Sequence, residues 1–236
     1  MAAEIVYNST TMFSSKTHLL QIALNGSLRD AESIIAGLPA SERIMIEVGT
    51  PMIKTFGAVA IQRIRALWSI RLAKAGIVQS ACIVADMKTM DRGAVEVSIA
   101  EEAGASAVIA LGQAPIETLN VFISACRRRK MTSMVDMMNI DKPYQILRKL
   151  AMLPDVVILH RGVDEERDSD KLLPIYLINK IKGTYDVRVA IAGGDTPREV
   201  QSAVFNGADI VILWKDFYSA ESKNGDITGE FLRTVK

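Results

Sequence analysis

Short apolar runs rich in β-branched residues alternate with longer segments of helical periodicity along nearly the whole chain. This alternation constrains the fold more than any other feature, because it is typical of repeated strand-helix units around a parallel sheet. Nearly all of the runs are apolar throughout, as expected of strands covered on both faces. The eight predicted strands are Leu19–Leu24, Ile44–Val48, Ala81–Ala85, Ala107–Leu111, Thr132–Asp136, Val156–His160, Val187–Ala192 and Ile210–Leu213.

Eight segments between and after these strands have helical periodicity. They are Ser27–Ala36, Ala58–Lys74, Arg92–Ala103, Ile116–Arg129, Lys142–Leu150, Asp170–Lys182, Pro197–Asn206 and a last helix near Asp226–Lys236. The boundary residues agree with this assignment, because Gly104 and Gly207 each end a helix with a residue that tolerates a left-handed conformation. Thr196-Pro197 starts a helix, with threonine as the cap and proline in the first turn.

Eight strands and eight helices predict an α/β fold of the (β/α)8 TIM barrel type, with residues 19–236 as one domain after an N-terminal extension of residues 1–18. An open, doubly wound sheet normally has fewer strands and a glycine-rich turn after the first strand. Here that turn reads Leu24-Asn25-Gly26-Ser27, which is not a GxGxxG motif. The barrel is therefore the better prediction.

Charged residues occur at the carboxyl ends of four predicted strands. They are Glu47, Asp86, Lys88, Asp136 and His160. In a parallel barrel these ends converge on one face, where the active sites of such barrels lie. The sequence therefore predicts a polar pocket built from residues that are distant along the chain.

Glu47 and Asp86 come from adjacent strands and could hold a hard cation. Magnesium takes a few carboxylate oxygens and keeps other positions for water and substrate, and the sequence has no His/Cys cluster of the kind that binds zinc. We therefore predict Mg²⁺ as the cofactor.

Lys88 lies two residues after Asp86, so an extended strand would present both side chains on the same face. A lysine among Asp86, Asp91 and Asp136 stays charged, which suits oxyanion stabilisation or proton donation better than Schiff-base formation. His160 titrates in the range useful for moving a proton at a reacting carbon. A structural ion pair of Asp86 with Lys88, and a core role for His160, are the alternatives.

Gly193 and Gly194 follow the seventh predicted strand and precede a helix start. Glycines there let backbone amides approach an anion, which predicts a phosphate site. Glycine pairs are also ordinary turn formers, and Asp195 would repel a phosphate unless it turns away or pairs with Arg198.

The charge balance and the cysteines limit the partners and the compartment. The chain has 28 basic and 27 acidic residues and a net charge of +1, so no overall field attracts nucleic acid or an anionic membrane. The basic run 127–130 ends a predicted helix, where cations complement the helix dipole. Cys82 and Cys126 are expected to be buried thiols in a reducing compartment. Neither a leader nor an apolar run of membrane-spanning length is found, and we expect a cytoplasmic protein.

Five segments, in order along residues 19–215, resemble the orotidine 5′-monophosphate decarboxylase superfamily, and within it the branch of 3-hexulose-6-phosphate synthases. They are Leu20-Gln21-Ile22-Ala23-Leu24, Ile46-Glu47-Val48-Gly49-Thr50-Pro51-Met52-Ile53-Lys54, Val84-Ala85-Asp86-Met87-Lys88-Thr89-Met90-Asp91, His160-Arg161-Gly162-Val163-Asp164 and Ala192-Gly193-Gly194. The combination of E-V-G-T-P with A-D-x-K-T-M-D is highly specific.

The resemblance implies a homodimer of barrels with shared active sites, in which Asp91 enters the site of the partner subunit. It further implies that Glu47 and Asp86 hold magnesium on a 1,2-enediolate made from a ketose phosphate. It also implies that proton transfer is arranged by Lys88, Asp136 and His160.

The substrate-binding residues that the resemblance implies are Asn25, Gly193, Gly194 and Lys215. Asn25 stands where the family has aspartate, and Trp214-Lys215 stands where the family has Gly-Arg. Lysine still neutralises a phosphate as a point charge, whereas tryptophan in place of glycine could block the anion. Asp195, which follows Gly193 and Gly194, is a third departure from the family pattern.

The implied reaction is the aldol condensation of formaldehyde with ribulose 5-phosphate, or the reverse cleavage. Val163 occupies the position where the decarboxylase branch has arginine, which favours the synthase. Two alternatives stay open: a relative acting on another sugar, such as a 3-keto-gulonate 6-phosphate decarboxylase, and a non-catalytic ligand-binding barrel with an altered phosphate site.

Overall fold

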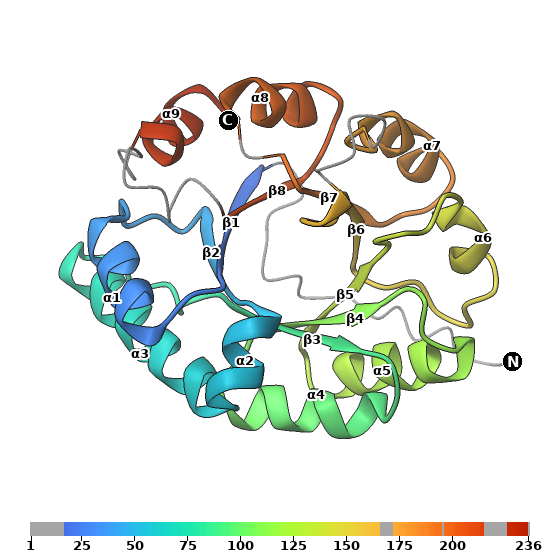
Figure 1. Cartoon of the computed structure of the whole chain (residues 1–236), viewed down its shortest axis with the longest axis horizontal. Helices are drawn as coiled ribbons and strands as arrows, with labels where there is room; N and C mark the ends of the chain where they lie inside the picture. Colours follow the sequence, from blue (N-terminus) through green and yellow to red (C-terminus); the bar gives the residue numbers. More distant parts are fainter. Residues whose placement is uncertain (1–16, 166–171, 195, 215–225, 236) are drawn as a thin grey trace, which may run out of the picture.

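The centre of the molecule is a closed barrel of eight parallel strands, seen end-on in Figure 1. The computed structural model describes residues 17–165, 172–194, 196–214 and 226–235. Each strand pairs with the next, and β8 pairs with β1, which confirms the predicted TIM barrel. The strands are β1 Leu19–Leu24, β2 Ile44–Val48, β3 Ile83–Thr89, β4 Ala107–Leu111, β5 Thr132–Asp136, β6 Val156–His160, β7 Arg188–Ala192 and β8 Ile210–Leu213.

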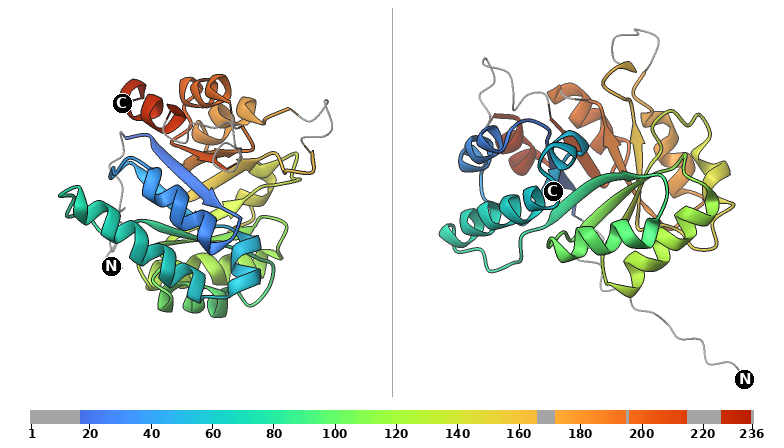
Figure 2. Two further views of the ribbon diagram at one scale, coloured as in Figure 1. Left: turned by 60° about the vertical axis from the view of Figure 1, so that its left-hand side comes forward. Right: turned by 60° about the horizontal axis from the view of Figure 1, so that its bottom comes forward.

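Helices surround this barrel on its outside, as the side views in Figure 2 also show. They are α1 Leu28–Gly37, α2 Thr50–Phe56, α3 Val59–Lys74, α4 Gly93–Glu102, α5 Ile116–Arg128, α6 Pro143–Leu147, the 3₁₀ turn η2 Ile175–Leu177, α7 Ile178–Lys182, α8 Pro197–Phe205 and α9 Asp226–Thr234. In the part of the chain that the structure describes, no helix combines the length and the apolar character needed to cross a membrane.

The third strand differs from its prediction, because β3 runs over Ile83–Thr89 and not over Ala81–Ala85. Asp86 and Lys88 therefore lie within the strand and not beyond its end. This extension was not predicted because strands were recognised by their apolar runs, and a strand that faces solvent or a pocket carries polar residues there. Pairing with β4 is irregular here and resumes at Thr89, opposite Ala110.

Three helical segments also differ from their predictions. Helix α2 was missed; proline stands at its start, and Gly57, with φ of 69°, separates it from α3. The helix predicted over Asp170–Lys182 is wrong in its described first part, because residues 172–174 are not helical and η2 begins only after Pro174. Proline lacks an amide donor and disfavours helix at the preceding residue. The helix predicted over Lys142–Leu150 shortens to α6.

The helix boundaries predicted from Gly104, Gly207 and Thr196 are confirmed. Gly104 and Gly207 have φ of 90° and 89°, the left-handed conformation in which glycine carries no steric penalty. Thr196 caps α8 and forms a reciprocal capping box with Glu199. Residues 1–16, Asp195 and Lys215 lie outside the described residues, so the predictions made for them stay predictions.

Two apolar layers stabilise the barrel. The larger layer packs the helices against the outer face of the strands and includes the fully buried Trp68 and Phe122. The smaller layer fills the inside of the barrel with alternate residues of the strands, such as Met45, Val84 and Ile158. A polar group among these inner rows must find a partner, because an unpaired buried charge is strongly unfavourable.

Candidate active site

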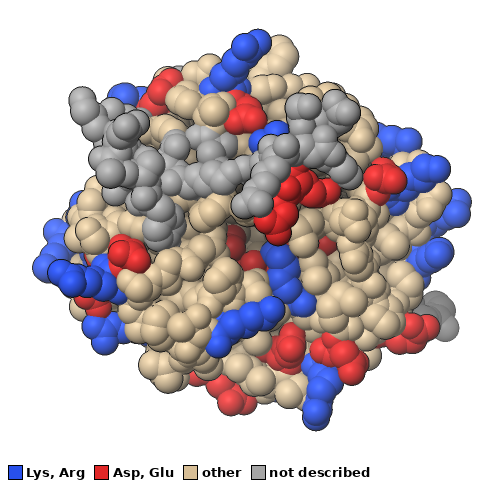
Figure 3. Space-filling view, viewed as in Figure 1, with Lys and Arg blue, Asp and Glu red and all other residues tan. Residues whose placement is uncertain are grey.

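Three strands of the barrel carry buried acidic side chains. Glu47 on β2, Asp86 on β3 and Asp136 on β5 are all buried, and none is more than 6% exposed. Glu47 and Asp136 lie at the carboxyl-terminal ends of β2 and β5, and Asp86 lies midway along the longer β3. A (β/α)8 barrel builds its site on the carboxyl-terminal side of its strands. In Figure 3, acidic and basic side chains lie around a central hollow on the face shown.

Lys88 connects two of these carboxylates. Its Nζ lies 2.8 Å from Asp86 Oδ2 and 3.0 Å from Asp86 Oδ1, and 2.8 Å from Asp136 Oδ2. Burial alone would lower the pKa of Lys88, but the charges of Asp86 and Asp136 outweigh burial and raise the pKa above its usual value. Both ion pairs favour the charged form of the lysine, which is the form that the sequence predicts.

The backbone at Lys88 is not extended, since its φ is 47°. The prediction that Lys88 and Asp86 reach the same pocket is confirmed by their contact, but the reason given for it was wrong. A left-handed conformation at a residue other than glycine costs about 1–2 kcal/mol. Such strain persists where the surroundings hold it, and it is concentrated at functional sites. Here the two ion pairs hold Lys88.

His160 lies on the other side of Asp136. Its Nδ1 is 2.8 Å from Asp136 Oδ2, while Asp136 Oδ1 accepts a hydrogen bond from the Met138 amide at 3.0 Å. Burial would raise the pKa of Asp136, but His160 and Lys88 lower it well below its ordinary value. Burial would lower the pKa of His160, and the charge and hydrogen bond of Asp136 raise it instead. Asp136 thus fixes the ring through Nδ1 and leaves Nε2 for proton exchange.

Glu47 is the least stabilised carboxylate of the group. Burial, followed by the negative charge of Asp86, raises its pKa to about 7. Gln21 Nε2 donates to Glu47 Oε2, and Thr50 Oγ1 donates to Asp86 Oδ2 at 2.9 Å. A divalent cation next to Glu47 and Asp86 would offset both the burial and the mutual repulsion, so the donor set is suited to one.

The structure sets a limit on the kind of metal site. Among the described residues, no group of three or more His, Cys, Asp and Glu side chains is arranged to hold a metal. A closed zinc cage of the usual kind needs four such ligands. Two carboxylates with other positions left for water and substrate oxygens suit magnesium, which stays a prediction.

Gln21 and Thr50 were not identified from the sequence as site residues. Gln21 has a signal that could have found it, because it is a polar residue in an inward row of the otherwise apolar β1, and it is fully buried. Thr50 begins α2 directly after β2, a position that becomes evident only once α2 is recognised.

Asn25 lies close to the end of β2. A Cβ placed on Gly49 would lie 1.9 Å from Asn25 Oδ1, so only glycine leaves room for this side chain. Trp214 follows β8, is partly buried and packs against the inner apolar layer. Lys215, the next predicted substrate ligand, is outside the described residues.

The glycine turn after β7 packs against the residue that follows β6. Gly193 has φ of 93°, and a Cβ on it would lie 2.2 Å from the carbonyl oxygen of Arg161. The Arg161 guanidinium also donates to the Gly193 carbonyl oxygen. Arg161 is thus another residue at the site that the sequence did not single out.

Asp91 does not join the buried cluster. It is exposed, and its Oδ1 accepts a hydrogen bond from the Arg92 amide at 2.7 Å. The expectation that it helps to surround Lys88 is wrong within this chain, where the carboxylates in contact with Lys88 among the described residues are Asp86 and Asp136. Asp91 instead lines a shallow groove at the start of α4 and α5.

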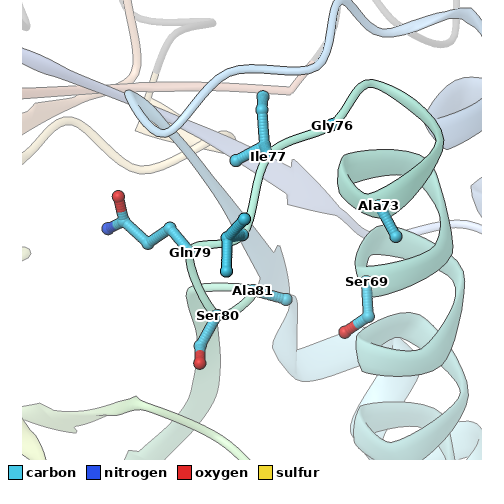
Figure 4. A pocket seen from close by; sticks show the side chains of 8 residues that line it. Ser69, Ala73, Gly76, Ile77, Gln79, Ser80 and Ala81 are labelled. Atoms are coloured by element: carbon cyan, nitrogen blue, oxygen red, sulfur yellow. The ribbon is translucent and has the colours of Figure 1, made fainter.

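A larger cavity, between the end of α3 and the beginning of β3, is remote from this chemistry (Figure 4). It lies at the amino end of the strand, whereas the charged cluster lies at the carboxyl ends. Its lining contains no carboxylate, imidazole, thiol or amine: Ser69, Ala73, Gly76, Ile77, Val78, Gln79, Ser80 and Ala81. Acid-base chemistry therefore belongs to the charged cluster.

The sequence matches the model of the orotidine 5′-phosphate decarboxylase / HUMPS family over residues 18–224. It is 34% identical over 220 residues to the bifunctional enzyme Fae/Hps of Methanocella arvoryzae, covering 92% of this chain and 53% of that protein. It is 38% identical over 200 residues to the Fae/Hps of Methanosphaera stadtmanae, covering 82% and 47%. The chain spans about half the length of the curated relatives it matches.

Solved structures of related proteins share the fold of this chain. A crystal structure of 3-hexulose-6-phosphate synthase superposes with a TM-score of 0.77 and 26% identity, covering 92% of this chain and 100% of that chain. The synthase of Salmonella typhimurium superposes with a TM-score of 0.76 and 26% identity, covering 91% and 99%. KGPDC from Streptococcus mutans shares the fold, with a TM-score of 0.70, 18% identity and coverage of 93% and 99%.

Proposed function

The chain belongs to the orotidine 5′-phosphate decarboxylase / HUMPS family, and from this premise we propose that it is a 3-hexulose-6-phosphate synthase-like lyase. It joins formaldehyde to ribulose 5-phosphate, or catalyses the reverse cleavage. The observation that carries the proposal is that one oxygen, Asp136 Oδ2, contacts both Lys88 Nζ and His160 Nδ1. This arrangement sets a fixed cation and a proton carrier side by side, as enediolate chemistry requires.

His160 moves the proton in this scheme. Nδ1 faces Asp136, so Nε2 takes the proton from C1 of ribulose 5-phosphate and leaves a 1,2-enediolate. The enediolate carbon then forms a bond to the formaldehyde carbon. The imidazolium returns the proton to the new alkoxide, and His160 is regenerated in its starting state.

Lys88 stabilises negative charge without giving up its proton. Despite burial, the charges of Asp86 and Asp136 raise the pKa of Lys88, which makes this lysine poorly suited to act as a base or a Schiff-base amine at neutral pH. As a preorganised donor in a water-poor site, it binds the oxygens on which charge develops. Asp136 contacts both Lys88 and His160 and holds them in position, so its role is to orient these two side chains.

Mg²⁺ is the cofactor in this proposal, with Glu47 and Asp86 as its protein ligands. When bound between these two carboxylates, a divalent cation would supply positive charge to stabilise the ketose oxygens. Thr50 and Gln21 hold the two carboxylates in place through their hydrogen bonds, as partners of metal ligands commonly do.

The phosphate of the substrate is assigned to the turn at Gly193 and Gly194, with Asn25 and Lys215 as further substrate ligands. The enzyme works as a homodimer in which Asp91 reaches the partner's site, and the exposure of Asp91 is consistent with that. A cytoplasmic location is part of the proposal, and the two buried, free cysteines are compatible with a reducing compartment.

Trp214 favours a second candidate function, in which the same chemistry acts on a different sugar. The side chain is partly buried against the inner layer at the end of β8, where bulk reshapes the volume left for a substrate. Binding of ribulose 5-phosphate and of unphosphorylated ketoses, compared by calorimetry, separates the two candidates.

The main test is direct. The protein is incubated with ribulose 5-phosphate, formaldehyde and Mg²⁺, and hexulose 6-phosphate is followed by chromatography and NMR. We expect product with the wild type and not with His160→Ala. Absence of product with the wild type, at substrate concentrations that calorimetry shows to be saturating, overturns the proposal in favour of a ligand-binding barrel.

A further inference from the structure

Arg161 connects the end of β6 to the glycine turn after β7. Its amide donates to the Ala192 carbonyl at 3.1 Å, which extends the pairing of the two strands by one residue. Its guanidinium Nη2 donates to the Gly193 carbonyl oxygen at 2.5 Å and lies 3.5 Å from Glu199 Oε1 in the first turn of α8. One side chain thus touches both the glycine turn and the start of the following helix.

The contact with Gly193 determines which backbone group the turn presents. In a planar trans peptide, the carbonyl and the following amide point in opposite directions, and the described chain has no cis peptide bond. Because the Gly193 carbonyl is directed at Arg161, the Gly194 amide is directed away from it. An anion is bound by amides and repelled by carbonyl oxygens, so a Gly193 carbonyl turned toward Arg161 leaves the turn free to offer the Gly194 amide, and not a carbonyl, to a phosphate.

The charge of Arg161 has a second effect at the turn. Glu199 brings a negative charge to the start of α8, where it accepts hydrogen bonds from Thr196. A carboxylate beside an anion site weakens binding unless a cation offsets it. Among the described residues, Arg161 is the cation that forms an ion pair with Glu199, at 3.5 Å. In addition, Arg161 Nε is buried without a hydrogen-bond partner among the described residues, and such donors are normally satisfied by water or ligand.

We infer that Arg161 is a positioning residue for the phosphate end of the substrate, which holds the Gly193-Gly194 turn in its anion-accepting orientation and offsets Glu199. The inference rests on the proposed function for the identity of the anion. It goes beyond that function because Arg161 sets the preference for a phosphorylated over an unphosphorylated sugar.

Arg161→Met removes the guanidinium and keeps much of the apolar length. Since a hydrogen bond to a charged group is involved, we expect the KM for ribulose 5-phosphate to rise roughly 10- to 100-fold, with kcat changed less than threefold. Inorganic phosphate binding, measured by calorimetry, weakens by a similar factor. Turnover or binding of free ribulose stays within about twofold, because that sugar does not use the turn.

Two further variants distinguish positioning from packing and from net charge. Arg161→Lys keeps the charge and one donor, and it recovers part of the lost phosphate affinity; this variant also decides the matter if Arg161→Met does not fold. Arg198→Met removes an exposed arginine from the first turn of α8, which also contains Glu199. We expect this variant to change phosphate affinity less than threefold.

The inference would be overturned by unchanged phosphate affinity in Arg161→Met, by equal losses of affinity in Arg161→Met and Arg198→Met, or by equal losses for ribulose and ribulose 5-phosphate. A wild type that does not bind phosphate also overturns it. If the wild type binds phosphate but forms no hexulose phosphate, the proposed function fails while the binding measurements still decide the role of Arg161.

Discussion

Lys88 Nζ on β3 lies 2.8 Å from Asp136 Oδ2 on β5, although β4 separates the two strands in the barrel. Both side chains are largely withdrawn from water, with exposed fractions of 19% and 1%. A charge pair in such surroundings is costly to break, because removing one partner leaves the other charge buried and unpaired. We therefore expect the link between β3 and β5 to contribute to stability as well as to the proposed chemistry.

Replacing Lys88 by methionine tests this relationship. We expect Lys88→Met to lose at least roughly 100-fold in kcat, as when one preorganised donor is removed from an oxyanion site. The free energy of unfolding should also fall, by about 3–5 kcal/mol, because Asp86 and Asp136 lose their shared cation. Steady-state kinetics and urea unfolding measure the two effects, with the exposed Lys74→Met on α3 as a matched control. Equal stability of the two variants would contradict a buried ion pair.

Asp136→Asn tests the pH dependence of the pair with His160. The pKa of His160 is raised above 6.5, so its contribution to stability is complete below about pH 6.5 and is lost as pH rises through the folded-state value. The pKa of Asp136 is lowered from 3.8, so its contribution is complete above about pH 3.8 and is lost as pH falls further. Between these values both contributions are present.

We therefore expect Asp136→Asn to be most destabilising between about pH 4 and 6.5, and progressively less so above that range. Urea unfolding from pH 4 to 9 in parallel with the wild type measures this difference. The rate profile should also move, because the His160 pKa in the variant falls toward or below its ordinary value. A destabilisation independent of pH across the whole range would show that the charges of Asp136 and His160 do not interact.

The contribution of Glu47 to stability depends on pH in the opposite direction to that of Asp136. The pKa of Glu47 is raised from 4.5 to about 7, so the folded state holds a proton that the unfolded state releases, and ionisation destabilises the fold as pH rises from 4.5 through 7. In the absence of metal, Glu47→Gln should gain stability relative to the wild type between pH 5 and 8, by up to about 3 kcal/mol. Mg²⁺ should stabilise the wild type at pH 8 and leave Glu47→Gln nearly unaffected. Equal thermal shifts with Mg²⁺ in both proteins would place the cation elsewhere.

The sequence was sufficient for the fold and for bringing most of the charged residues to one face, because both depend on short-range patterns. Apolar runs at regular spacing predicted all eight strands, and the carboxyl ends of those strands predicted that Glu47, Asp86, Asp136 and His160 share one face. The contact of Lys88 with Asp86 was predicted from an extended backbone, whereas Lys88 has φ of 47° within β3. A left-handed backbone at a lysine has no local sequence signal, since the surrounding charges impose it.

Contacts between loops were the part that could not be predicted. Arg161 follows a histidine that was singled out, but its contact with Gly193 depends on how the turns after β6 and β7 pack together. Gln21 is polar in an apolar strand, and only the register of β1 with β2 shows that it reaches Glu47. Asp91 lies in the same motif as Lys88, yet the chain turns at Arg92, with φ of 55°, and Asp91 is left on the surface.

The position of Asp91 leads to a prediction about the dimer. If Asp91 completes the partner's site, Asp91→Ala and Lys88→Ala are each inactive alone, but a mixed dimer has one intact site, built from Lys88 of one chain and Asp91 of the other. In an isologous dimer with random exchange, half of the dimers are mixed and one of their two sites is intact. Co-refolding the two variants in equal amounts should therefore restore about a quarter of the wild-type activity. Activity no higher than that of the separate variants, in a mixture shown by native mass spectrometry to contain mixed dimers, would mean that Asp91 does not enter the partner's site.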